Sequence, residues 1–60
     1  MFDLDIINHA EFLAQMCEPF ERVQVFLQRE GYNLTETEDE LEGRELITKL
    51  GNGWVVCELI

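Results

Sequence analysis

Hydrophobic residues in the first half of the chain recur every three or four positions, the spacing of one face of an α-helix. Over residues 3–17 the apolar side chains fall on a single arc that ends with Cys17, and Asp3 stands where an N-cap residue would. A second apolar stripe runs from Pro19 to Glu30, and Gly31 follows at the position that tolerates a left-handed conformation. The pattern therefore predicts two amphipathic helices, the second beginning at Pro19.

After Gly31 the spacing of the pattern changes from about 3.6 residues to two, and β-branched and aromatic residues become frequent. Alternation of this kind predicts a short strand over residues 32–37. The acidic residues that follow, over 38–43, are typical of a solvated turn. A further strand would then lead into the C-terminal part of the chain.

Residues 38–50 also permit a different interpretation. Thr37 and Glu40 have the spacing of a capping box, which would open a helix running to Leu50. Gly43 lies in the middle of that helix, and its apolar residues do not complete one stripe. Turn plus strand is the favoured prediction, with the helix as its alternative.

The strongest local signal is Gly51-Asn52-Gly53-Trp54, because Asn-Gly supplies the two positive-φ residues of a type I′ hairpin turn. Pairing Gly51 with Trp54 divides the hairpin into two faces. The face predicted to lie on the core carries Leu46, Thr48, Leu50, Val55, Cys57 and Leu59. The face predicted to point outward is too hydrophobic to meet only water, since it carries Ile47, Trp54, Val56 and Ile60 among Glu45, Lys49 and Glu58.

Together these elements predict a single domain over residues 1–60 with an α+β fold. Two N-terminal helices would pack on a three-stranded antiparallel β-meander that ends in the Asn-Gly hairpin. A chain of this length buries only about 60% of the surface that its unfolded form exposes. We therefore expect its stability to depend on additional support, such as a partner or a second copy.

Charge narrows the classes of partner. Thirteen Asp and Glu against four Lys and Arg give a formal charge of −9. Because the four cations are scattered, direct binding to nucleic acid or to an anionic membrane is not expected. Glu18 stands four residues before Arg22, which predicts an exposed ion pair. Without an apolar run of about 18 residues or a basic N-terminal segment, we expect a cytoplasmic protein in which Cys17 and Cys57 stay reduced.

The sequence contains few residues suited to catalysis or to metal binding. There is no serine, and His9 and Cys17 would be separated by about 12 Å along one helix, at about 1.5 Å per residue. A structural zinc site needs about four N or S ligands, whereas the chain offers one His and two Cys. The acidic turn does not follow the calcium-loop pattern, and no glycine-rich phosphate motif is present. We predict a protein without catalytic residues, cofactor or metal, and not an enzyme.

Two hypotheses of function follow. The first is a small acidic interaction module, an inhibitor or regulator that occupies a basic, nucleic-acid-binding surface of a partner protein, by analogy with proteins that mimic DNA. Its partner-binding residues would be Glu36, Glu38, Asp39, Glu40 and Glu42. The alternative is a homodimer or small subunit assembled through the outer hairpin face, at Ile47, Trp54, Val56 and Ile60. The simpler interpretation of the charge is that it keeps a small protein soluble.

Overall fold

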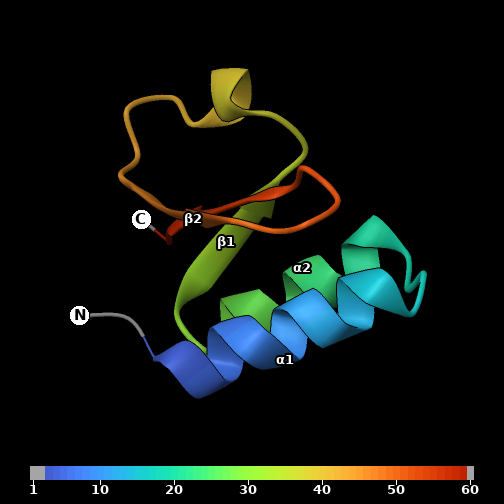
Figure 1. The fold of residues 1–60 in the computed structure, drawn as a ribbon. Coiled ribbons are helices and arrows are strands. Elements are labelled where there is room, and N and C mark those ends of the chain that lie inside the picture. The colour runs from blue at the N-terminus through green and yellow to red at the C-terminus, as the bar shows by residue number, and fades with distance from the viewer. Residues whose placement is uncertain (1–2, 60) are drawn as a thin grey trace.

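Two helices form one layer of the structure, a computed structural model that describes residues 3–59 (Figure 1). Helix α1 spans Leu4–Gln15, and the Asp3 side chain caps it by accepting a hydrogen bond from the backbone N–H of Asp5 at 2.9 Å. Helix α2 spans Phe20–Arg29 and begins directly after Pro19. Because α1 ends before Cys17, that residue lies in the turn with φ 62° and is exposed. The prediction that Cys17 belongs to the buried arc of the helix is therefore wrong.

Three antiparallel strands form the second layer: β1 (Tyr32–Thr35), β2 (Leu46–Lys49) and β3 (Val55–Glu58). Two helices and a three-stranded antiparallel sheet confirm the predicted α+β class. The strand order, however, is β1-β3-β2, so the prediction of a meander is wrong. Strand β3 occupies the centre because three consecutive residues, Val55, Val56 and Cys57, are all fully buried, which requires cover on both faces.

The hairpin between β2 and β3 differs by one residue from the predicted register. Leu50 donates its N–H to the carbonyl of Trp54 at 2.8 Å, and Gly53 donates to the carbonyl of Leu50 at 3.0 Å. The connecting loop therefore has three residues, with φ 98° at Gly53, and Asn52 is not among the positive-φ residues. Lys49 rather than Leu50 faces Val55, and a bulge follows between Leu46 and Thr48.

A shift of one residue moves every side chain of a strand to the other face. Val56 therefore packs against the helices, in a buried cluster with Leu34 of β1 and Leu50. Ile47 and Trp54, predicted to point outward, also pack against this cluster. The helical members of the cluster are Ile7, Ala10, Ala14, Val23 and Leu27.

The segment between β1 and β2 forms a third layer. Since these two strands lie on opposite sides of β3, their connection must cross the sheet, and it does so on the face away from the helices (Figure 1). Val55 and Cys57 alternate with Val56 and so point to that face, where both are fully buried. The crossing segment contains a single 3₁₀ turn, η1 (Glu38–Glu40), and the alternative helix to Leu50 does not form.

Side chains of the helices hold the sheet in place. Gln24 donates to the Leu34 carbonyl at 3.1 Å, which fastens α2 to β1. The Glu11 carboxylate accepts the N–H of Gly51 at 2.8 and 3.0 Å, which fastens α1 to the hairpin loop. Among residues 3–59, no helix has both the length and the apolar character needed to cross a membrane.

Candidate functional site

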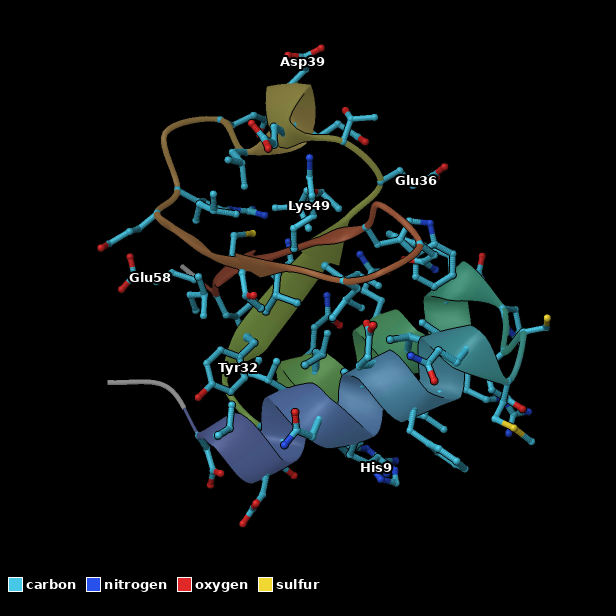
Figure 2. All side chains as sticks on the ribbon, in the orientation of Figure 1. His9, Tyr32, Glu36, Asp39, Lys49 and Glu58 are labelled. Carbon is cyan, nitrogen blue, oxygen red and sulfur yellow. The ribbon has the colours of Figure 1, made fainter. Side chains whose placement is uncertain are left out.

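Residues 36–45, named here the acidic loop, carry six of the thirteen acidic residues of the chain. All six carboxylate side chains belong to exposed residues. Figure 2 shows Asp39 at the tip of the loop and Glu36 at its side, both directed away from the sheet. The sequence-predicted residues Glu36, Glu38, Asp39, Glu40 and Glu42 thus all belong to this loop and are all exposed.

Two of the five predicted acidic residues have structural partners. Glu40 accepts backbone N–H bonds from Glu36 at 3.2 Å and from Thr37 at 3.1 Å, and completes a capping box. Glu38 forms an ion pair of 3.1 Å with Lys49 of β2, half exposed on both sides. An exposed pair of this kind contributes only about 0–1 kcal/mol, but it fixes where the Glu38 carboxylate lies.

The other three predicted carboxylates, those of Glu36, Asp39 and Glu42, make no hydrogen bond or ion pair to any residue in the described part of the chain. They are therefore free to accept donors from outside. The predicted site divides into two residues that shape the loop and three that face solvent.

The backbone of the acidic loop is fixed at several points. At its start, the Thr35 hydroxyl donates to the Thr37 carbonyl at 3.0 Å. At its end, the Glu45 carbonyl accepts the N–H of Glu58 at 3.2 Å. Between them Glu42, with φ 51°, turns the chain back toward the sheet. A surface held in this way loses little conformational entropy when a partner binds to it.

The hairpin residues predicted for a dimer do not share an outer face. Val56 is fully buried, and Ile47 and Trp54 are partly buried against the core. The Trp54 ring packs edge-to-face on Phe20 of α2 with 5.3 Å between centroids. Ile60 lies outside the described residues. The register shift turns Trp54 and Val56 toward the helices, and the bulge between Leu46 and Thr48 lets Ile47 reach the same side.

Of the reactive side chains, His9 lies on α1, Cys17 in the turn between the helices, and Cys57 on β3 beneath the acidic loop. His9 packs between Phe12 and Phe26 on the far side of the helices, at 6.3 and 4.8 Å between ring centroids (Figure 2). Cys17 is exposed and Cys57 is buried, and both are free. Within residues 3–59, no group of three or more His, Cys, Asp or Glu side chains is placed to hold a metal ion. The acidic loop offers charge and fixed geometry, which suit binding.

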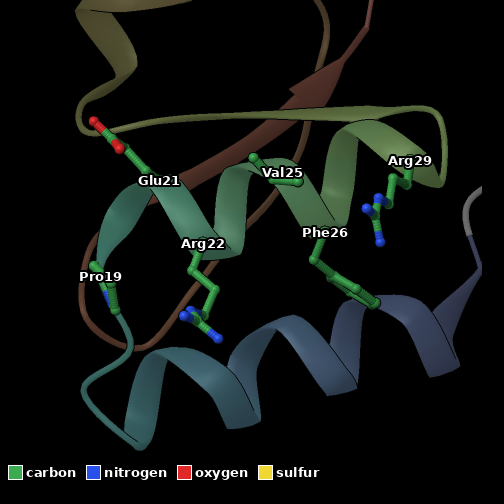
Figure 3. Close-up of a pocket in the computed structure, with 6 residues that line it drawn as sticks. All are labelled: Pro19, Glu21, Arg22, Val25, Phe26 and Arg29. Carbon is green, nitrogen blue, oxygen red and sulfur yellow. The ribbon is translucent and has the colours of Figure 1, made fainter.

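The structure has a second candidate binding surface, which the sequence analysis does not predict. It is an open groove on the exposed side of α2 (Figure 3), lined by Pro19, Glu21, Arg22, Val25, Phe26 and Arg29. The predicted ion pair between Arg22 and Glu18 is confirmed there at 3.1 Å. The sequence signal for this groove is Val25, an apolar residue outside the apolar stripe of its helix. In the structure the Val25 side chain is 49% exposed.

The acidic loop lies on one side of the sheet, and α2, whose residues line the groove, lies on the other (Figure 1). The chain matches no known protein family, and no curated protein or solved structure is significantly similar to it.

Proposed function

We propose that the protein is a non-enzymatic interaction module whose acidic loop binds a basic surface of a partner protein and so inhibits or regulates that partner. The observation that supports this proposal is the group of three exposed carboxylates, Glu36, Asp39 and Glu42, which have no partner in the described residues. They extend from a backbone that is fixed at both ends of the loop.

The density of negative charge favours the acidic loop over the rest of the surface as the site that binds a basic partner. Six acidic residues occur within ten positions of the loop, and the remaining seven (13 − 6) are spread over the other fifty. Surfaces that bind nucleic acid present rows of Lys and Arg to phosphates, and a close row of carboxylates is complementary to the same cations. Such complementarity raises the rate of association and sets orientation more than it raises affinity.

The two structural acids define which substitutions test the proposal. Loss of Glu40 would remove the capping box, and loss of Glu38 would remove the ion pair to Lys49, so either change removes a contact of the loop as well as a charge. Neutralising Glu36, Asp39 and Glu42 changes its charge and leaves these contacts in place. The informative variant is therefore E36Q/D39N/E42Q.

We expect the wild-type protein, immobilised and exposed to an extract of its host, to retain a basic partner that E36Q/D39N/E42Q does not retain. Retention should weaken as salt rises, because the screening length falls from about 10 Å at about 0.1 M to about 3 Å at about 1 M. Duplex DNA added to the extract should displace the protein from a partner that uses a nucleic-acid-binding surface. The measurement is quantitative mass spectrometry of the retained proteins.

The control for this capture is D5N/E30Q/E58Q, which removes the same number of charges from exposed positions outside the loop. It should retain the partner almost as well as the wild type. Equal losses in both triple variants would show that only net charge matters, and the acidic loop would then have no specific role. A partner retained unchanged at about 1 M salt would contradict the electrostatic basis of binding.

A further inference from the structure

The helical layer exposes apolar side chains that nothing in the described structure covers. Of the large hydrophobic residues that are at least 44% exposed, four belong to the helices or the turn between them, namely Leu4, Phe12, Met16 and Val25. Val25 lies at the centre of the exposed side of α2, in the groove beside Phe26 (Figure 3). Of these four residues only Val25 lines the groove, so it supplies the apolar contact of that surface.

The charges around Val25 have a regular order. Glu21, Val25 and Arg29 follow one another at intervals of four residues, so they form one ridge along the exposed side of α2. All three line the groove and are exposed. The ridge has a carboxylate at one end, an apolar residue in the middle and a guanidinium at the other end, about 12 Å along the axis from the first.

A ridge of this order is complementary to itself when it is reversed. We propose that the exposed side of α2 binds a second copy of the chain, with the two α2 helices antiparallel across a two-fold axis at Val25. In this arrangement Val25 meets Val25 of the second copy, and each Glu21 faces the other copy's Arg29. A two-fold contact needs one self-complementary patch, and each attractive pair then occurs twice.

Electrostatics favour a second copy at this position. Two chains of charge −9 repel each other in most orientations. Two of the four cations, Arg22 and Arg29, lie on this side of α2, so negative charge does not dominate there. The acidic loop lies on the side of the sheet opposite the helices (Figure 1), so a contact through α2 does not bring the two acidic loops directly together. Arg22 is already paired with Glu18, which leaves Arg29 to meet the second copy.

Analytical ultracentrifugation of the pure protein tests the proposal, with the chain itself as the only ligand. The wild type should dimerise with rising concentration. Glu21→Arg places Arg opposite Arg29 twice, and Arg29→Glu places Glu opposite Glu21 twice, so each variant alone should dimerise at least about ten-fold more weakly. Mixed in equal amounts, the two variants should form a heterodimer, because both pairs are then of opposite charge.

Both charge reversals oppose the helix dipole, so their folding has to be checked by circular dichroism. Val25→Lys is a third variant, which tests the same contact without opposing the dipole. Val25 is half exposed and Lys is a good helix former, so this variant should fold and stay monomeric. It should also retain the partner of the acidic loop, which separates this proposal from the function proposed above. A wild type that stays monomeric at millimolar concentration, or a variant mixture without heterodimer, would overturn the proposal.

Discussion

Replacing Val56 with Asp is expected to unfold the protein, while the same substitution at Leu46 is expected to leave it folded. Val56 is fully buried in the cluster between sheet and helices, whereas Leu46 is 46% exposed on an edge strand. Burying an unpaired carboxylate costs several kcal/mol. A domain of 60 residues has a total stability of only about 3–9 kcal/mol, at about 0.05–0.15 kcal/mol per residue.

The two substitutions distinguish the observed register from the one that the Asn-Gly motif predicts. In the predicted register Val56 points outward and Leu46 inward, so the order of the two effects is reversed. Far-UV circular dichroism and urea titration of both variants provide the measurement. A folded Val56→Asp variant beside an unfolded Leu46→Asp variant would show that the hairpin pairs Gly51 with Trp54.

The thiol of Cys57 is expected to react with an alkylating reagent at least about 100-fold more slowly than that of Cys17, which corresponds to an opening free energy of about 2.7 kcal/mol. Cys57 is fully buried on the sheet face that the acidic loop crosses, and Cys17 is exposed in the turn between the helices. Mass spectrometry of Cys17→Ser and Cys57→Ala, each with one remaining thiol, measures the two rates separately.

This protection depends on the acidic loop, so loosening the loop should reduce it. Glu40→Ala removes the side chain that accepts the backbone N–H groups of Glu36 and Thr37. Loss of a cap costs about 0.5–2 kcal/mol, so the Cys57 rate should rise several-fold while the helices remain intact. In urea both thiols should react at similar rates. Equal rates for the two thiols in the native protein would show that the loop does not cover the sheet.

The sequence was sufficient to predict the elements that depend on neighbouring residues. Helix and strand periodicity, the cap at Asp3 and the break at Pro19 act within a few residues, and the structure has its elements close to those positions. The ion pair of Glu18 with Arg22 is also local, because residues four apart meet on any helix.

The order of the strands depends on contacts between distant residues. The sequence favours a meander because strands that are consecutive in the chain usually pair. The run Val55-Val56-Cys57 contains the missing information, since a strand without alternation is buried on both faces. Such a strand belongs at the centre of a sheet.

The predicted register of the hairpin is wrong for a different reason. Asn52-Gly53 fits both a two-residue loop and a three-residue loop with Gly in the left-handed conformation, and these differ by one residue in pairing. The two-residue loop places Val56 and Trp54 on the outer face of the hairpin, whereas in the structure both pack against the core.

For the candidate site, the sequence identifies the acidic loop and the capping-box spacing of Thr37 and Glu40, and the structure has that capping box at the start of a 3₁₀ turn instead of a helix to Leu50. The ion pair of Glu38 with Lys49 joins residues that are distant in the sequence, so it follows only from the fold.

The fold also places the acidic loop on one side of the sheet and α2, which carries the ridge of Glu21, Val25 and Arg29, on the other (Figure 1). If both proposals hold, a dimer would present two acidic loops, and a partner with two basic sites would bind more tightly by avidity.

The most direct test of the proposed function is a titration of the isotope-labelled protein with the basic partner recovered in the capture experiment, followed by NMR of the backbone amides. We expect the amides of residues 36–45 to shift first and most strongly, and those of Glu21, Val25 and Arg29 to stay unchanged at a fixed protein concentration. Shifts confined to α2, or spread evenly over the surface, would contradict the assignment of the acidic loop as the binding site.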